Sequence, residues 1–425
     1  MQTARTATVL ASAIGFALSA ALGAQTSSID SLASRIDPYV AKSRVIVMTD
    51  IANEPDDQMS MVRFLVYANR YDVEGLIAST STWMRRTVRP DVILTLLDAY
   101  ALVQPNLERH EKGFPSLHYI AMPSTPDGQQ YYLATWTGTS GDRFYKNAPG
   151  ADFSTFTDAW VTEHIRSKGP LGKLYPFPCC IHEGDTPAFL GLVDNGLASF
   201  MSPTYGGWGG RYVWRQFYGE TRPSWTQGGV SYPGNDNSRD AVEGSDGKTY
   251  TSDQATIWRW RTAFQHDFAA RMDWTVKDVR EGNHNPVVVV NGQAGKAPVM
   301  VDAVVGTPVL LDATGTHDPD GQTLTYNWFF YPEAGTGIPG RPVVTRGLRP
   351  VVAAGQVGAG SIPSAGAGGP PEPQTRVIVE NAHEVKATVL PRVAGIAHVI
   401  VAVEDSGTPS LTSYRRVILN IKPRP

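Results

Sequence analysis

The first part of the chain alternates between continuous apolar runs and segments with helical periodicity. The run Arg44-Val-Ile-Val-Met-Thr-Asp50 predicts a buried strand, and Asp72-Val-Glu-Gly-Leu-Ile-Ala78 predicts a second one. Between them, Pro55 suits the first position of a helix whose apolar residues recur at helical spacing. Because a β-α-β unit places its strands in parallel, this pattern predicts an α/β domain with an open, mostly parallel sheet.

Two further helices are predicted in the same domain. Residues 90–102 carry apolar side chains at helical spacing, and Ser252 is expected to cap a later helix. The buried face of that later helix would carry Ile257, Trp260, Phe264 and Phe268. Residues 116–120 predict another strand, and residues 123–251 predict mainly long loops with short elements between them, because they are rich in Gly, Pro, Tyr and Trp.

From Asn285 onward the pattern changes to short β-rich runs separated by turn residues. These runs are residues 287–290, 308–311, 323–331, 397–403 and 414–421. They predict a small all-β sandwich. Residues 333–374 are dominated by Gly, Pro and Ala, so they carry too little apolar bulk to pack, and we predict a disordered insert there.

The N-terminus has the pattern of an export signal. A short polar start with Arg5 precedes the apolar run Val9 to Leu22, and the small residues Gly23 and Ala24 follow it. The run is too short and too rich in Ala and Gly to favour a membrane-spanning helix. The alternative interpretation is an uncleaved membrane anchor. We therefore predict a signal peptide at 1–24, a periplasmic or secreted protein, and no membrane association after its removal. The predicted domains are then 38–282 for the α/β domain and 284–425 for the sandwich.

The charge and the cysteine content limit the classes of partner and of cross-link that the sequence allows. The formal net charge is -3 with both signs interspersed, so no basic face for nucleic acid is predicted. The two cysteines, Cys179 and Cys180, are adjacent, which excludes a disulfide framework. No pattern in the sequence specifies an oligomeric state.

Four aspartates at predicted strand and helix ends are candidates for chemistry. Asp50 ends the first strand, and Asp56 and Asp57 lie in the first turn of the next helix. Together with Asp253 they offer carboxylate oxygens that suit a hard cation, calcium first and magnesium as the alternative. Such a cation can hold vicinal sugar hydroxyls while a free carboxylate, for which we choose Asp56, accepts a proton from an attacking water. The structural alternative is that these acids only complement helix N-termini.

The stretch Thr49-Asp-Ile-Ala-Asn-Glu-Pro-Asp-Asp57 resembles the signature of the inosine/uridine-preferring nucleoside hydrolase superfamily. Its longer gap before the Asp-Asp pair resembles one branch, the nucleoside-hydrolase-like bacterial proteins often named cellulose-binding proteins. The segments Glu183-Gly-Asp-Thr-Pro187, Gly206-Gly-Trp-Gly-Gly-Arg-Tyr212 and Tyr250-Thr-Ser-Asp-Gln-Ala-Thr-Ile-Trp258 resemble the same branch. The resemblance implies Asp50, Asp57 and Asp253 as calcium ligands and Asp56 as the catalytic base.

Three further residues are candidate ligand contacts. Asn53 and Glu54 lie inside the signature, and Trp208 lies in a Gly-rich loop of the kind that can present a flat aromatic face to a sugar. Simple packing is the alternative for Trp208.

Two departures from the superfamily weaken the catalytic interpretation. Ser252 stands where the superfamily often has a His that acts on the leaving base. In addition, residues 105–115 lead almost directly into the predicted strand at 116–120, where related proteins carry further strands and helices. We interpret this as a deletion in the middle of the hydrolase-like domain, and a compact natural variant is the alternative.

The C-terminal region resembles polycystic-kidney-disease-type and related immunoglobulin-like sandwich modules. Residues 311–328 match their turn and following strand, and Val403-Glu-Asp-Ser-Gly407 resembles their last hairpin. Trp328 is then expected in the core.

The sequence supports three functions. The first is an exported hydrolase of nucleosides or related N-glycosyl compounds that uses calcium and is weakened or inactivated by the missing elements. The second is a cellulose- or polysaccharide-binding protein on a hydrolase-derived scaffold. The third is a truncated remnant without an active site. The expected ligand is accordingly a nucleoside, another ribosyl compound or a polysaccharide, and the sequence leaves open whether the protein is an enzyme.

Overall fold

The computed structural model describes residues 42–81, 84–116, 149–177, 182–215, 224–226, 238–335 and 376–425. The predicted signal peptide at 1–24, the predicted strand beyond Ser116 and most of the predicted insert at 333–374 lie outside these residues. Residues Lys42–Pro425 form one compact unit. Among the described helices, none combines the length and the apolar character needed to cross a membrane.

The β-α-β unit forms where the sequence predicts it. It consists of β1 (Ser43–Thr49), α2 (Pro55–Val66), the short turn η1 (Ala68–Arg70) and β2 (Tyr71–Ala78). The two strands pair in parallel, and in the described residues they form a two-stranded sheet. The open parallel sheet is thereby confirmed, and the carboxyl ends of both strands lie at the same edge of the sheet.

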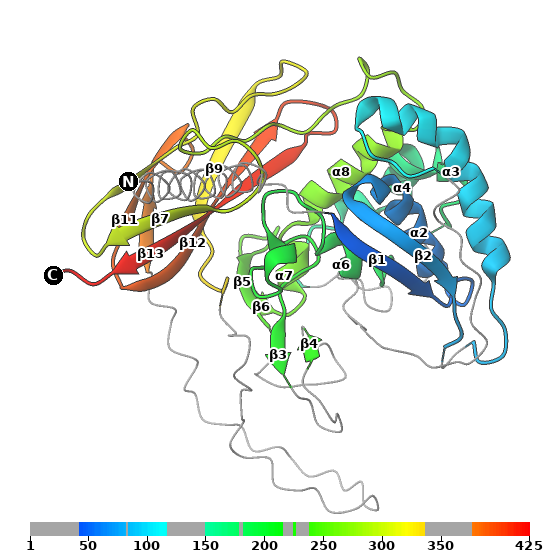
Figure 1. The fold of residues 1–425 in the computed structure, drawn as a ribbon, viewed down its shortest axis with the longest axis horizontal. Helices are drawn as coiled ribbons and strands as arrows, with labels where there is room; N and C mark the ends of the chain where they lie inside the picture. Colours follow the sequence, from blue (N-terminus) through cyan, green and yellow to red (C-terminus); the bar gives the residue numbers. More distant parts are fainter. Residues whose placement is uncertain are drawn as a thin grey trace, which may run out of the picture. The chain divides into compact units, whose positions relative to one another are not determined.

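Three helices pack against one another beside this sheet (Figure 1): α2, α3 (Pro90–His110) and α8 (Arg261–Trp274). α3 continues beyond the predicted end at residue 102, through Pro105. A proline inside a helix removes one hydrogen bond, and Pro105 is exposed, so water can solvate the carbonyl group that loses its partner.

The helix predicted after Ser252 is divided into α7 (Ala255–Trp258) and α8. Ser252 is the last residue of β6, and its Oγ accepts a hydrogen bond from the amide of Ala255, the first residue of α7, at 3.0 Å. The N-cap position of α7 is Gln254 and not Ser252 as predicted, because two turn residues separate β6 from the helix. The predicted face is buried along both helices: Ile257, Trp260, Phe264 and Phe268.

The described residues between 149 and 252 form short elements joined by loops, as predicted. The helical elements are η3 (Ser154–Phe156), α4 (Asp158–Val161), η4 (Thr162–Arg166), α5 (Gly169–Lys173), α6 (Thr186–Leu190) and η5 (Ser199–Met201). Two antiparallel hairpins follow, β3 (Val213–Arg215) with β4 (Ser224–Thr226) and β5 (Asp240–Glu243) with β6 (Thr249–Ser252).

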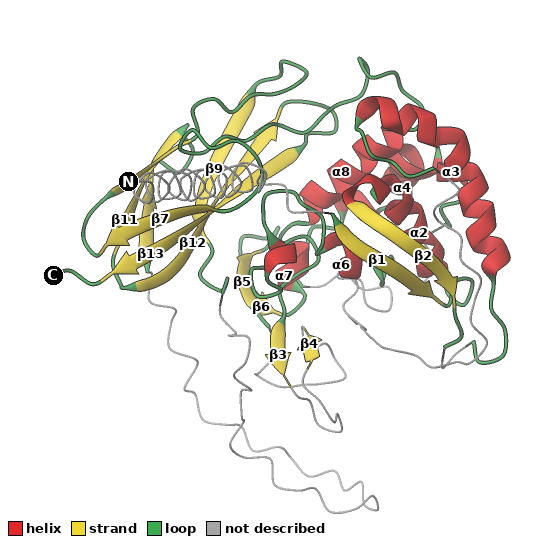
Figure 2. Cartoon of the chain, in the orientation of Figure 1, coloured by secondary structure: helices red, strands yellow, loops and turns green. Residues whose placement is uncertain are grey.

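The C-terminal region is all-β and consists of two sheets, as Figure 2 shows. One has the order β7-β13-β12-β9 and the other β10-β11-β8. The strands are β7 (Val299–Val304), β8 (Val309–Asp312), β9 (Leu324–Phe330), β10 (Val377–Glu380), β11 (Lys386–Pro391), β12 (Gly395–Asp405) and β13 (Thr412–Lys422). Trp328 lies in the core between them, as expected. The predicted strand at 287–290 forms only isolated bridges, whereas β7, β10 and β11 were not predicted.

The helical region and the sandwich share one hydrophobic cluster. Trp260 and Phe264 of the first lie in the same cluster as Tyr331, Ile400 and Tyr414 of the second. The two predicted domains are therefore in direct contact. Their predicted limits at residues 282 and 284 stay a prediction.

Candidate functional site

The acidic signature lies at the carboxyl end of β1. Asp50 follows the strand, and a turn closed by a 3.1 Å hydrogen bond from the amide of Asn53 to the carbonyl of Asp50 leads into α2. Pro55 begins the helix, so Asp56 and Asp57 fall in its first turn. A negative charge at this position is favourable, because the helix N-terminus carries partial positive charge.

Asp57 is buried, with 5 % of its surface exposed. Thr49 Oγ1, at the end of β1, donates a hydrogen bond of 2.6 Å to Asp57 Oδ1. Burial raises the pKa of Asp57 most, and the charge of Asp185 raises it further. Without a compensating positive charge, the Asp57 carboxyl therefore tends to hold a proton.

Asp56 is also buried, with 7 % of its surface exposed. Backbone amides, including that of Gly184, donate hydrogen bonds to its carboxylate. Its Oδ1 has no hydrogen-bond partner among the residues that the structure describes. Burial and the neighbouring Asp50 raise the pKa of Asp56 in spite of those amides.

Asp185 is a further member of this cluster, and sequence reasoning missed it. It precedes α6, and its carboxyl lies close enough to that of Asp57 for its negative charge to raise the pKa of Asp57. Asp185 is exposed, yet the protein groups around its carboxyl limit its hydration and raise its pKa, and the charge of Asp56 adds to this. The segment Glu183-Gly-Asp-Thr-Pro187 contained the signal, but an acid before a helix start also has the pattern of a simple helix cap.

A buried ion pair fixes the segment before α6 to α2. Arg63 of α2 and Glu183 are both fully buried, and Arg63 Nε lies 2.6 Å from Glu183 Oε2. Tyr175 donates a second hydrogen bond to Glu183, at 2.7 Å. Thr186 Oγ1 donates to Ser60 Oγ at 2.9 Å. These contacts fix the start of α6 on α2 and thereby place Asp185 beside Asp57.

Glu54 extends the cluster at its exposed side. The pKa of Glu54 is raised by partial burial, then by the charges of Asp56 and Asp50. Asn53 is half-buried in the turn between Asp50 and Glu54. The structure therefore brings together the predicted Asp50, Glu54, Asp56 and Asp57, and adds Asp185.

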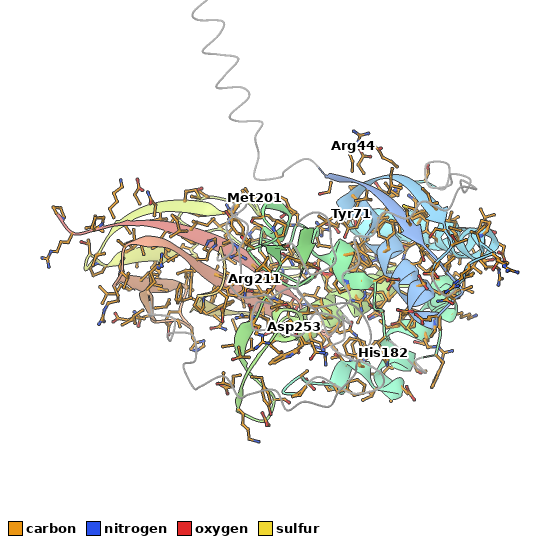
Figure 3. All side chains as sticks on the ribbon, turned by 90° about the horizontal axis from the view of Figure 1, so that it is seen from below. Arg44, Tyr71, His182, Met201, Arg211 and Asp253 are labelled. Atoms are coloured by element: carbon orange, nitrogen blue, oxygen red, sulfur yellow. The ribbon has the colours of Figure 1, made fainter. Side chains whose placement is uncertain are left out.

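Asp253 lies between β6 and α7 (Figure 3). Its Oδ1 accepts a hydrogen bond from the amide of Gln254 at 3.0 Å, and its carbonyl accepts one from Thr256 Oγ1 at 2.6 Å. The main charges that raise the pKa values of Asp56, Asp57 and Asp185 are those of one another and of Asp50 and Glu54. A calcium-binding role for Asp253 stays a prediction.

The cluster fits a hard cation in its chemistry, because it consists of carboxylate oxygens and includes the unpartnered Oδ1 of Asp56. Its geometry is less complete. In the described part of the chain, no group of three or more His, Cys, Asp or Glu side chains is arranged so that it could hold a metal ion. A calcium ion would therefore require the carboxylates to move closer together or to be supplemented by ligand oxygens.

Trp208 is not available to a ligand in this structure. Only 1 % of its surface is exposed, and its ring packs edge-on against Tyr414 of β13, with 6.5 Å between the ring centroids. Packing, the alternative considered for this residue, therefore describes its environment. Its candidate role as a ligand contact stays untested.

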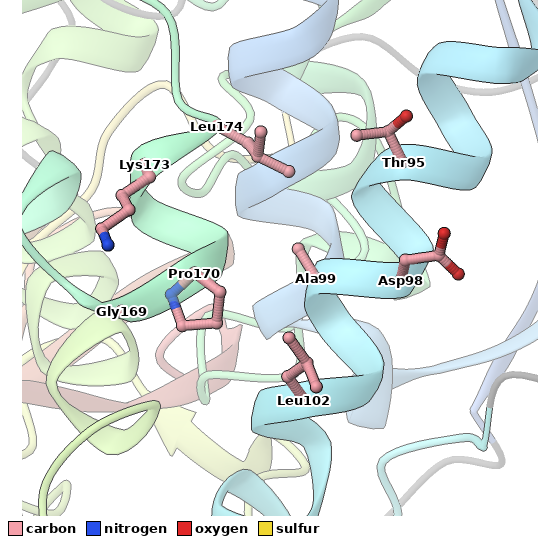
Figure 4. Close-up of a pocket in the computed structure, with 8 residues that line it drawn as sticks. All are labelled: Thr95, Asp98, Ala99, Leu102, Gly169, Pro170, Lys173 and Leu174. Atoms are coloured by element: carbon pink, nitrogen blue, oxygen red, sulfur yellow. The ribbon is translucent and has the colours of Figure 1, made fainter.

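A shallow pocket of about 590 Å³ lies between α3 and α5 (Figure 4). It is lined by Thr95, Asp98, Ala99, Leu102, Gly169, Pro170, Lys173 and Leu174. None of the predicted site residues is among them, and the lining is mostly apolar. The carboxylate cluster is therefore the candidate site for polar chemistry.

The parallel β-α-β unit with acids at its carboxyl edge, followed by a β-sandwich, defines a nucleoside-hydrolase-like protein with an added β domain. Residues 44–126 and 112–212 match the family model of the cellulose-binding Sde182, nucleoside hydrolase-like domain. Residues 308–421 match that of the cellulose-binding protein Sde0182, C-terminal domain. The chain belongs to this cellulose-binding, nucleoside-hydrolase-like family, which confirms the resemblance found in the sequence.

A similar solved structure is that of a nucleoside hydrolase-related hypothetical protein from Saccharophagus degradans, described as associated with carbohydrate metabolism. It is 27% identical, with a TM-score of 0.62, and the match covers 90% of this chain and 100% of that chain. The PKD domain from KIAA 1837 protein is 18% identical, over 30% of this chain and 86% of that one, with a TM-score of 0.16. No curated protein matches the chain.

Proposed function

We propose that the protein binds a carbohydrate-containing ligand at the cluster formed by Asp50, Asp56, Asp57 and Asp185, and that a calcium ion completes the site. The observation that carries this proposal is the gathering of these carboxylates, with Asp56 Oδ1 buried and unpartnered among the described residues. Buried carboxylates need protons, cations or hydrogen-bond donors, and sugar hydroxyls are donors. The family's cellulose-binding description supports a sugar ligand.

Within this site the acids have different roles. Asp50 and Asp57 would hold the ion, with Asp253 as the third ligand that the family resemblance implies. Bound calcium would supply the positive charge that grips vicinal hydroxyls. Asp56 would remain free to accept a hydrogen bond from a ligand hydroxyl or a proton from water. Export by the segment 1–24 to the periplasm or the exterior is part of the same proposal.

A second candidate function is slow hydrolysis of N-glycosidic bonds. The raised pKa of Asp56 favours it, because a general base works best when its pKa approaches the working pH. Ser252 opposes it, since its hydroxyl, which accepts a hydrogen bond from the Ala255 amide, cannot donate a proton to a leaving base as an imidazolium does. We propose that binding is the main function and that hydrolysis is weak.

Calorimetric titration tests both candidates on chelator-treated protein. We expect calcium to bind, and cellohexaose or inosine to bind only after calcium is present. Asp56→Asn should weaken ligand binding, because it removes the acceptor charge. Asp72→Asn, on the exposed amino end of β2, makes the same chemical change away from the cluster and should behave as wild type.

The outcomes separate the candidates. If no sugar ligand binds with or without calcium, the binding proposal is wrong. Release of free base from inosine or uridine is measured on the same samples. Rapid release that Asp56→Asn abolishes would show that hydrolysis, not binding, is the main function.

A further inference from the structure

Exposed aromatic rings are scarce in the part of the chain that the structure describes. Its large buried core contains Trp208, Trp258, Trp260, Trp274 and Trp328. Two phenylalanines, in contrast, have exposed side chains: Phe153, with 37 % of its surface exposed, and Phe177, with 50 %. Covering an exposed aromatic ring with a ligand removes apolar surface from water and so favours binding. Both phenylalanines are therefore candidates for a ligand contact.

Phe153 is held in place by its neighbours. Its ring lies nearly parallel to that of Phe156, at 6.2 Å and 21°, and meets the ring of His182 edge-on at 6.3 Å. Phe156 is itself buried, with the Arg261 guanidinium 5.0 Å from its ring centroid. A ring fixed in this way loses little freedom when a ligand stacks on it.

The environment of Phe177 is different. The guanidinium of Arg166 lies over its ring, 5.0 Å from the centroid. One face of Phe177 is therefore already in contact with a cation, and Phe177 serves as a control for the loss of an exposed phenyl group.

The backbone connects Phe153 to the carboxylate cluster by a short route. His182, which contacts the Phe153 ring, is followed by Glu183, by Gly184, whose amide donates to Asp56, and by Asp185. The Phe153 ring contacts the first residue of the segment 182–185, and the last two residues of that segment belong to the carboxylate cluster or contact it.

A second connection runs through α8. Gln265 donates to the carbonyl of Thr155 at 3.1 Å and accepts a hydrogen bond from Arg63. Arg63 also forms the buried ion pair with Glu183. The segment that carries Phe153 and the segment that carries Asp185 are thus fastened to the same buried side chains.

Resting on the proposed function, we propose that Phe153 is the aromatic wall of the sugar site. A sugar ring has an apolar face of C–H groups and a rim of hydroxyls. The exposed face of Phe153 would stack on the C–H face, while the carboxylates accept hydrogen bonds from the hydroxyls. Phe153 would then favour ligands whose ring presents a continuous C–H face, as the glucose units of cellohexaose do.

The test compares Phe153→Ala and Phe177→Ala, two variants that each remove one exposed phenyl group. Titration with cellohexaose in the presence of calcium should show binding about tenfold weaker for Phe153→Ala. Phe177→Ala should stay within about twofold of wild type. Phe153→Tyr should retain affinity and Phe153→Leu should not, because leucine keeps the apolar bulk without the flat ring. Circular dichroism verifies that each variant is folded.

Three results would overturn the role of Phe153 while leaving the proposed function intact. They are wild-type affinity in Phe153→Ala when Asp56→Asn is weakened, equal losses in Phe153→Ala and Phe177→Ala, and a loss confined to inosine, which would assign the ring to the base instead of the sugar. Absence of cellohexaose and inosine binding in wild type would instead overturn the proposed function itself.

Discussion

At the scale of single residues, the carboxylate cluster is under electrostatic stress unless a cation is bound. Asp57 is buried beside Asp185 and near Asp50 and Asp56, so each added negative charge disfavours the others. Such a cluster destabilises the folded protein when it is ionised, and clusters of this kind are concentrated at binding and catalytic sites.

Replacing Asp57 by Asn tests this stress directly. Asparagine keeps an oxygen that can accept the hydrogen bond from Thr49, but it does not titrate, so the folded protein no longer has to bury an ionised carboxylate or take up a proton at this position. In the presence of a chelator we expect Asp57→Asn to raise the free energy of unfolding by about 1 to 3 kcal/mol. In calcium the wild type should gain stability and the variant should gain less. Thermal denaturation with and without calcium measures both effects.

A matched variant, Asp253→Asn, makes the same chemical change at the aspartate between β6 and α7. It should change the stability in chelator less than Asp57→Asn does, because Asp253 is not among the main charges that raise the pKa of Asp57. A lower stability of Asp57→Asn in chelator would mean that Asp57 is ionised and favourably paired there.

Residue-scale prediction succeeded where the acids are close in sequence. Asp50, Asp56 and Asp57 belong to one β-α unit, so local spacing was enough to bring them to one edge of the sheet. Asp185 joins them only through the contacts of Arg63 and Glu183, which link residues 120 positions apart, and no local pattern contains that information.

At the scale of elements, α2, α8 and the start of α6 are joined by one buried guanidinium. Arg63 pairs with Glu183, donates to the carbonyl of Phe264 at 3.2 Å and lies 3.9 Å from the ring centroid of Phe268. A buried ion pair is costly to break from one side, because the remaining charge has no partner.

We therefore expect Arg63→Leu to lower the free energy of unfolding by about 3 to 5 kcal/mol. The double variant Arg63→Leu/Glu183→Gln should recover part of that loss, since it removes the unpaired carboxylate as well. Urea denaturation of the wild type, both single variants and the double variant gives the coupling energy. A double variant as unstable as the sum of its parts would show that the pair contributes through packing alone.

Element-scale prediction was accurate for long periodic segments and weak for short ones. β1, α2 and β2 have a dense apolar pattern, and each forms at its predicted place, whereas the helix predicted after Ser252 is divided into α7 and α8. β10, with four residues, gains its order from pairing with β11, so its own sequence carries little signal.

At the scale of the whole molecule, the sandwich helps to hold the loops of the first region. Arg416 of β13 is fully buried and donates hydrogen bonds to the carbonyl groups of Leu197 at 2.6 Å, Tyr205 at 3.0 Å and Gly206 at 3.0 Å. The sequence predicted two domains, and their contact could not be predicted because it depends on side chains more than 200 positions apart. One arginine thereby links the last strand to the Gly-rich loop.

His398 of β12 completes this junction. It is buried, with 2 % of its surface exposed, and Arg416 Nη1 lies 3.1 Å from its Nδ1. Because a guanidinium can only donate, Nδ1 must accept, and the imidazole is neutral with its proton on Nε2. Burial, followed by the charge of Arg416, lowers the pKa of His398 to about 3.

This neutral imidazole predicts how stability depends on pH. Below the unfolded pKa of about 6.5 the unfolded chain takes up a proton at His398, while the folded protein does so only near pH 3. As pH falls from 6.5 towards 3, His398 should therefore cost the folded state about 1.4 kcal/mol per pH unit.

His398→Gln does not titrate and keeps an acceptor for Arg416, so its stability should fall less steeply than that of the wild type in urea denaturation at pH 7, 6 and 5. Carboxylates elsewhere affect both proteins equally, and His317→Gln, at an exposed position, should follow the wild type. Parallel stability curves for wild type and His398→Gln would show that the imidazole is protonated in the fold, and that Arg416 holds the Gly-rich loop without it.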